Sequence, residues 1–283
     1  MVVVGNLAVG GSGKTPLVIW LTLTAAARGW RPGVVLRGYG GREPGITAVT
    51  ADSDPAAVGD EAVVIAGRTG CPVMIGRDRV AAAHALVDTH QVDLVISDDG
   101  LQHYRLARDV EIAVVDARRG HGNGRCLPAG PLREPPHRLT EVDAVLGHGG
   151  AVDAAGHRFE LLADELRPVT GNASAPPIPG ERIHAVAGIG HPERFFDTLR
   201  GMGFEVITHA FGDHHRYRSD DLRFGDTAAL VMTEKDAVKC RAIAPPSSWY
   251  LPVAAQPDVA SARHLEGLLD RAQQRFNNRE ERP

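Results

Sequence analysis

Three glycines, a lysine and a threonine lie close together near the start of the chain and could bind the phosphates of a nucleotide. Gly10, Gly11 and Gly13 let a loop turn its backbone N–H groups toward an anion. Lys14 adds a positive charge for the β- and γ-phosphates, and Thr15 adds a hydroxyl that can bind Mg²⁺. The combination predicts a phosphate-binding loop of the P-loop type.

A short strand before this loop and a helix after it would hold the loop in place. Val2, Val3 and Val4 are a β-branched run typical of a buried strand, and a helix is predicted over 16–28. Ala8 stands where the usual spacing, G-x-x-x-x-G-K-S/T, has its first glycine. Because strand, glycine-rich loop and helix occur in the required order, we favour a phosphate site over an ordinary turn.

A pair of acids follows a second apolar strand. Residues 92–97 are predicted to form a buried strand, and Asp98 and Asp99 come directly after it. A carboxylate at the tip of such a strand can hold Mg²⁺ beside the P-loop threonine, as in a Walker B element. An Asp-Asp-Gly sequence is also ordinary turn chemistry. The P-loop upstream favours the metal role, and the sequence does not decide which acid binds the metal directly.

Other polar residues could complete a site for phosphoryl transfer. Arg37 and Tyr39 follow the second predicted strand, where open α/β sheets bind ligands, although a plain turn is an equal alternative. Asp60 opens a helix, where the helix dipole alone favours an acid. His214 and His215 lie in a loop after a later strand. If the acceptor is an alcohol, Asp60 and one of these histidines are candidates to take its proton.

A long irregular segment over 117–138 is rich in glycine, arginine and proline. Loops of this length in compact domains are usually functional or disordered. Arg133 and Glu134 within it combine a candidate transition-state cation with a candidate metal carboxylate. Gln102 and His103 follow the Asp-Asp pair closely enough to contact the same ligand.

The composition is that of an ordinary globular protein, with 43% hydrophobic and 23% charged residues among 283. A net charge of −4 gives no basic field, so no nucleic-acid partner is expected. The three cysteines lack the spacing of a disulfide framework or a zinc site. Without a signal peptide or a membrane-spanning run we expect a cytoplasmic chain, and peripheral membrane contact stays open.

The order of predicted elements indicates an α/β fold in two parts. Residues 1–150 alternate strands and helices and are predicted to form a P-loop NTPase-like domain with a mainly parallel sheet. Residues 151–181 are predicted to be a linker with a β-ribbon at 157–169, and 182–283 a second, smaller α/β domain. The last predicted helix, 258–276, has an apolar face that we expect to pack in a core.

Seven stretches of the chain, in order, resemble the tetraacyldisaccharide 4′-kinase family: GNLAVGGSGKTP, RGYGG, VGDE, SDDGLQHYRLARDVEIAVVD, LPAGPLRE, the Asp-His-His loop and MTEKDAVK. The resemblance covers essentially the whole chain, and that family's loop also lacks the first glycine. It implies ATP-dependent phosphorylation of the 4′-hydroxyl of an acylated glucosamine disaccharide 1-phosphate, which gives lipid IV-A in lipid A (lipopolysaccharide) biosynthesis. It also implies two α/β domains joined by a small β-ribbon.

The resemblance further implies roles for single residues. Asp60 matches the catalytic aspartate of the family, and His214 is favoured over His215 as its partner. Asp98 and Asp99 match the Walker B pair. The other matched positions are the phosphate-binding Ser12, Lys14 and Thr15, the metal-associated Glu134, and the active-site residues Arg37, Tyr39, Arg79, Gln102, His103 and Arg133. Arg133 could stabilise charge that develops on the transferred group.

One departure from the family concerns the membrane. Members usually carry a hydrophobic or amphipathic segment before the first strand, thought to hold them at the inner membrane, whereas Met1 directly precedes the strand here. We therefore expect weak, peripheral contact with the cytoplasmic face of the inner membrane. On the residues alone, a nucleotide-dependent switch or assembly ATPase and a kinase of water-soluble small molecules stay open as alternatives.

Overall fold

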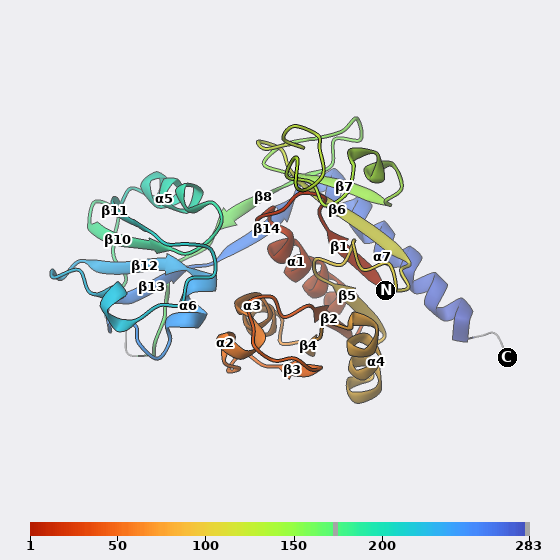
Figure 1. The fold of residues 1–283 in the computed structure, drawn as a ribbon, viewed down its shortest axis with the longest axis horizontal. Coiled ribbons are helices and arrows are strands. Elements are labelled where there is room, and N and C mark those ends of the chain that lie inside the picture. The colour runs from red at the N-terminus through yellow and green to blue at the C-terminus, as the bar shows by residue number, and fades with distance from the viewer. Residues whose placement is uncertain (172–174, 281–283) are drawn as a thin grey trace.

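The chain folds into two sheets with helices, joined by a pair of antiparallel strands (Figure 1). This computed structural model describes residues 1–171 and 175–280, with side chains up to residue 275. None of the helices in the described part of the chain has both the length and the apolar composition to cross a bilayer.

The larger sheet has nine strands in the order β14-β8-β7-β6-β1-β5-β2-β4-β3. Its strands are β1 (Val2–Gly5), β2 (Pro32–Leu36), β3 (Thr47–Val49), β4 (Val73–Ile75), β5 (Leu94–Ser97), β6 (Val110–Asp116), β7 (Ala144–His148), β8 (Arg158–Ala163) and β14 (Val253–Pro257). Neighbours from β8 to β4 pair in parallel, and only the two edge strands, β14 and β3, are antiparallel. The carboxyl ends of β1 and β5 therefore lie side by side.

Helices cover both faces of this sheet. They are α1 (Lys14–Ala27), α2 (Pro55–Val58), α3 (Asp60–Thr69), α4 (Arg79–His90), the 3₁₀ helix η1 (Pro136–Thr140) and α7 (Val259–Glu280). Leu17 of α1, Ile65 of α3 and Leu265 of α7 share one hydrophobic core with the sheet. Leu86 of α4 packs in a separate core with Val35 and Met74. The sheet thus has helices on both faces, as its apolar parallel strands require.

The smaller sheet has five strands in the order β11-β10-β12-β13-β9. Its elements are β9 (Arg167–Pro168), β10 (Arg182–Ala187), α5 (Pro192–Gly201), β11 (Glu205–Ala210), the 3₁₀ helix η2 (Ser219–Leu222), β12 (Ala229–Thr233), α6 (Glu234–Cys240) and β13 (Ser248–Leu251). Phe195, Phe196 and Leu199 of α5 fill its own hydrophobic core. Helix α6 packs against α3 of the larger sheet, so the two parts of the molecule meet there.

The mainly parallel α/β fold is confirmed. In the C-terminal part of the chain, however, the two sheets do not follow the domain ranges predicted above. Within the range predicted for the second domain, β13 lies in the smaller sheet, whereas the next strand, β14, lies in the larger. Helix α7 packs on the larger sheet, where Leu265, Leu268 and Leu269 are buried. An apolar stripe predicts that a helix packs in a core, but it carries no information about which sheet receives it.

The residues of the predicted ribbon at 157–169 do not pair with one another. Strand β8 pairs with β14, about ninety residues away along the chain, and β9 joins the smaller sheet by pairing with β13. The connection between the two parts is therefore made by two strands that are distant in sequence, which a local turn pattern cannot indicate.

Candidate active site

The glycine-rich loop lies between β1 and α1, at the carboxyl end of the larger sheet. Gly13 precedes the helix with a φ of 86°, and a Cβ there would lie 3.2 Å from His148 Nδ1, so glycine is required. No side chain caps α1 and no acid lies in its first turn, which leaves its backbone N–H groups available to an anion. Asn6 donates its side-chain amide to Ser12 Oγ at 3.2 Å and so fixes the loop.

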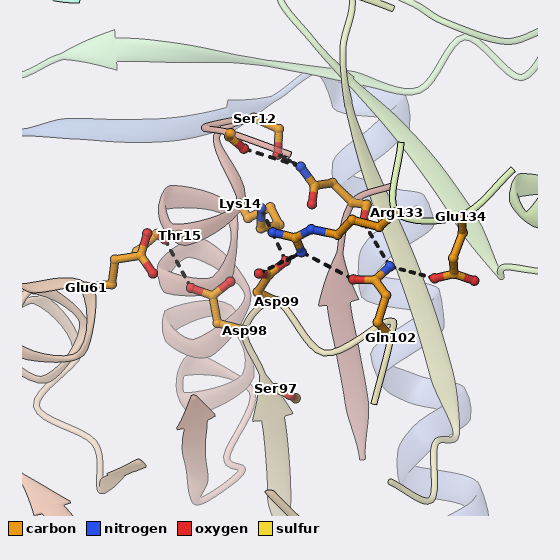
Figure 2. Close-up of polar contacts among 12 residues, drawn as sticks. Ser12, Lys14, Thr15, Glu61, Ser97, Asp98, Asp99, Gln102, Arg133 and Glu134 are labelled. Carbon is orange, nitrogen blue, oxygen red and sulfur yellow. Dashed lines mark hydrogen bonds and ion pairs between the residues drawn. The ribbon is translucent and has the colours of Figure 1, made fainter. Parts of the chain in front are cut away.

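The two acids after β5 lie beside this loop because β5 pairs in parallel with β1. Thr15 donates its hydroxyl to Asp98 Oδ2 at 3.0 Å, and Lys14 Nζ lies 3.4 Å from Asp99 Oδ1 (Figure 2). Asp98 Oδ1 is buried and accepts no hydrogen bond from the described residues. Burial, reinforced by the charge of Glu61, raises the pKa of Asp98 to about 7. A buried carboxylate oxygen without a donor, next to a threonine hydroxyl, fits a ligand of Mg²⁺.

Arg133 and Glu134 are adjacent in sequence but have different partners. Arg133 Nη1 donates to both carboxylate oxygens of Asp99 at 2.7 and 2.8 Å and to Gln102 Oε1 at 3.2 Å. Glu134 accepts from Gln102 Nε2 at 2.6 Å and from the Tyr104 hydroxyl at 2.5 Å. In Figure 2, Arg133 extends to the acids and Glu134 lies beyond Gln102. Glu134 thus orients Gln102 here, and its metal role stays a prediction.

Among the described residues, side chains alone form no metal cage. The described residues contain no group of three or more His, Cys, Asp and Glu side chains arranged to hold a metal ion. Nucleotide-bound Mg²⁺ usually has one or two carboxylates, waters and phosphate oxygens as ligands. If this site holds Mg²⁺, Asp98 and Thr15 would suffice as the protein's ligands.

A cavity of about 590 Å³ lies next to the acids. Its lining includes the predicted site residues Arg37, Tyr39, Arg79, Asp98, Asp99, Gln102, His103 and Arg133. Arg79 is buried, and its Nη1 donates to the backbone carbonyls of Asp98 at 3.1 Å and Asp99 at 2.7 Å. Arg79 thus supports the turn that carries the acids. Tyr39 is 64% exposed, which places it at the rim of the cavity.

Asp60 and His214 come from different parts of the chain and meet beside this cavity, which Gly59 and Glu61 line. His214 Nδ1 lies 3.2 Å from Asp60 Oδ2. Burial alone would raise the pKa of Asp60, but the hydrogen bond from His214 and two lysines of α6 outweigh it, and the pKa is lowered. The same hydrogen bond raises the pKa of His214.

His215 has a different partner from its neighbour. Its Nε2 lies 3.2 Å from Asp221 Oδ2, within its own part of the chain. His214 adopts a φ of 57°, and its backbone N–H donates to Gly188 O at 3.3 Å. The geometry therefore assigns the contact with Asp60 to His214.

Two contributors were missed by the sequence reasoning. Asn6 holds the P-loop serine, and Tyr104 holds Glu134. Asn6 lies inside a stretch that resembles the kinase family, but the spacing between Asn6 and Ser12 in the sequence does not predict that their side chains meet. Tyr104 follows His103 directly, and its proximity to Glu134 depends on how the long segment folds back.

Comparison with known proteins gives consistent matches over nearly the whole chain. Residues 1–273 match the family described as LpxK, tetraacyldisaccharide-1-P 4′-kinase. The tetraacyldisaccharide 4′-kinase of Alkalilimnicola ehrlichii is 57% identical over 274 residues, 96% of this chain and 82% of the relative. That of Azotobacter vinelandii is 53% identical over 277 residues, 96% of this chain and 83% of the relative.

A solved structure has the same fold. The "apo" form of LpxK from Aquifex aeolicus in complex with ATP superposes with a TM-score of 0.78 at 24% identity, over 96% of this chain and 87% of that chain. The family match and the relatives establish the kinship that the sequence motifs predicted. The chain belongs to the tetraacyldisaccharide-1-P 4′-kinase family.

Proposed function

We propose that the chain transfers the γ-phosphate of ATP to the 4′-hydroxyl of a tetraacyldisaccharide 1-phosphate, using the cavity beside the P-loop. As a member of this family it is a kinase with an alcohol acceptor. The observation that carries the proposed site is the contact of Asp60 with His214 beside the cavity that Asp98 and Asp99 also line. The proposed proton acceptor thus lies next to the cavity that the proposed nucleotide-phosphate site opens into.

The donor half of the site consists of the P-loop and the acids after β5. Lys14 and the N-terminus of α1 would bind the phosphates, and Thr15 and Asp98 would hold Mg²⁺. Bound Mg²⁺ neutralises negative charge on the phosphates during transfer. Arg133, which Asp99 orients, supplies a further positive charge for the transferred group.

The acceptor half consists of Asp60 and His214. Asp60 is ionised at neutral pH because its pKa is lowered, so it can take the proton of the acceptor hydroxyl, directly or with His214 as relay. The hydroxyl oxygen then bonds to the γ-phosphorus, and the bond from that phosphorus to the oxygen of the leaving ADP breaks. His214 orients the carboxylate through the 3.2 Å contact.

We also propose peripheral contact with the cytoplasmic face of the inner membrane, because the acceptor carries four acyl chains. Tyr39, which is 64% exposed, and Leu127, which is 55% exposed, both line the cavity and present apolar surface to the solvent. Sedimentation with phospholipid vesicles should detect weak binding of this chain. Tight binding would contradict the expectation of weak contact.

One transfer experiment separates the proposed activity from its alternatives. ATP labelled at the γ-phosphate is incubated with tetraacyldisaccharide 1-phosphate, with water-soluble alcohols, or without an acceptor. Label in the disaccharide lipid supports the lipid kinase. Label in inorganic phosphate without an acceptor supports a switch or assembly ATPase, and label in a soluble alcohol supports a small-molecule kinase.

A further inference from the structure

Lysine is scarce in this chain, and each lysine forms an ion pair with an acidic residue of the candidate active site. Lys14, Lys235 and Lys239 are the only lysines among 31 lysines and arginines. Lys14 belongs to the P-loop, whereas the other two lie on α6. Lys235 Nζ pairs with Glu61, and Lys239 Nζ lies 3.8 Å from Asp60 Oδ2. The two acids that begin α3 therefore each face a lysine from the smaller sheet.

These contacts are part of a larger ionic interface between α3 and α6. Lys235 and Lys239 are four residues apart and so lie on one face of α6. Farther along α3, Arg68 Nη1 lies 3.0 Å from Glu234 Oε2. Because α3 belongs to the larger sheet and α6 to the smaller, every one of these ion pairs joins the two parts of the molecule.

Lys239 is itself held by a carboxylate that has no exposure to solvent. Asp236 is 0% exposed, and its Oδ1 lies 2.7 Å from Lys239 Nζ. Its Oδ2 accepts hydrogen bonds from Thr233 Oγ1 at 2.6 Å and from Gly188 N at 2.9 Å. The carbonyl of Gly188 accepts the backbone N–H of His214. One buried carboxylate thus fixes both Lys239 and the backbone that carries His214.

We propose that Lys239 is a positioning residue for phosphoryl transfer: it holds the Asp60 carboxylate in the orientation that meets His214, with Asp236 as its anchor. The proposal rests on the proposed function of this site. Lys239 Nζ and His214 Nδ1 approach the same oxygen, Oδ2 of Asp60, at 3.8 and 3.2 Å. The ammonium, by charge, and the imidazole, by its closer contact, therefore both attract one oxygen, which restricts how the carboxylate can rotate.

The setting of Lys239 suits an ammonium better than a guanidinium. Its side chain is 12% exposed and its Nζ lies 5.2 Å from the centre of the Tyr217 ring. A lysine places a point charge against a single oxygen, whereas the planar fork of an arginine needs room for five donors. The titratable groups that face Asp60 are His214 from the loop after β11 and Lys235 and Lys239 from α6. On its own helix, the backbone N–H of Glu61 donates to Asp60 Oδ1 at 2.8 Å.

The test compares Lys239→Met with Arg68→Met in the full chain. Both substitutions remove a cation from the α3–α6 interface, but Arg68 contacts Glu234 and lies more than two turns from Asp60 along α3. Lys239→Met should lower kcat roughly 10- to 100-fold, as loss of an orienting partner often does. The KM for ATP should stay close to that of the wild type, and Arg68→Met should leave kcat unchanged.

Two further readouts distinguish positioning from a merely structural role. The acidic limb of the kcat profile should move upward by about one pH unit in Lys239→Met, because a nearby positive charge favours the ionised form of Asp60. The His214 imidazole, followed by NMR, should also titrate at a higher pH. That titration needs no substrate, so it tests the role of Lys239 even if the proposed activity fails.

A kcat and an acidic limb equal to those of Arg68→Met, or an unchanged or lower pKa of His214, would overturn the proposal. If Lys239→Met fails to bind ATP, Lys239→Ala with added propylammonium provides a second test. Partial recovery of kcat with the free amine would support the role, and no recovery would overturn it. An inactive wild-type chain with a shifted His214 titration would refute the proposed function alone.

Discussion

Asparagine in place of Asp60 keeps the size and shape of the side chain but removes its charge and its ability to accept a proton. The carboxylate is 5% exposed, with His214 Nδ1 at 3.2 Å and Lys239 Nζ at 3.8 Å from the same oxygen. A positioned general base contributes roughly 10²- to 10⁴-fold to a rate. At 1.36 kcal/mol per tenfold, this corresponds to about 3–5 kcal/mol of activation free energy. We expect Asp60→Asn to lose activity within this range.

The loss should be in kcat rather than in the KM for ATP, because the polar contacts of Asp60 are with His214, Lys239 and the backbone of Glu61. His214→Ala should also lower kcat, and the double variant should be little slower than the slower single variant, since residues that act as a unit are not additive. His215→Ala is the matched control. Its neighbour in sequence reaches Asp60, whereas His215 contacts Asp221, so His215→Ala should retain wild-type kcat.

The assay measures initial rates of label transfer to tetraacyldisaccharide 1-phosphate over a range of pH, with circular dichroism to establish folding. For the wild type, kcat should fall as the pH falls through the lowered pKa of Asp60, since the protonated acid cannot accept a proton. Folded Asp60→Asn protein with a kcat within roughly tenfold of the wild type would remove Asp60 from the mechanism.

Other contacts lead to further expected outcomes. Arg194→Ala should lower the free energy of unfolding by about 1–3 kcal/mol, because Asp116 is buried and loses the guanidinium 2.7 Å away. Burial would raise the pKa of Asp116, but Arg194 and backbone donors outweigh it, and the pKa is lowered. The contribution of this carboxylate to the free energy of unfolding should therefore be present at neutral pH and vanish as the pH falls through that pKa. Calorimetry over a range of pH can measure this loss. Gly13→Ala should weaken ATP binding about tenfold or more in titration calorimetry, since strain at a φ of 86° costs roughly 1–3 kcal/mol. Leu265→Ala should lower the free energy of unfolding by about 2–5 kcal/mol in urea titrations, because its fully buried side chain packs in the larger core. Chelation of divalent cations should abolish label transfer, and added Mg²⁺ should restore it.

Features that depend on neighbours in sequence could be predicted from the sequence. The strand, loop and helix around Gly13 form a continuous stretch, and Asp98 follows its strand directly, so parallel pairing of β1 and β5 was enough to bring Thr15 to Asp98. The same reasoning gave the α/β fold, because apolar runs and helical stripes alternate along the first part of the chain.

Features that depend on which distant surfaces meet could not be predicted from local pattern. Asp60 and His214 are 154 positions apart, and only a family resemblance connected them before their contact at 3.2 Å was seen. The sequence analysis placed the helix that begins at Val259 in the same domain as the smaller sheet. An apolar stripe shows that a helix packs in a core, but it does not indicate which sheet the helix packs against. The contact of Lys239 with Asp60 also depends on two distant segments meeting, so it was not predicted, although the rarity of lysine is visible in the sequence.

The antiparallel pair of β8 and β14 has a consequence for synthesis on the ribosome. The smaller sheet is built from β9 to β13, so all of its strands have emerged once residue 251 has left the exit tunnel, and it can fold as a unit. The larger sheet begins with the first residues translated, but its core includes Ala255 and the buried leucines of α7. The nucleotide-binding part, although synthesised first, therefore completes its fold last.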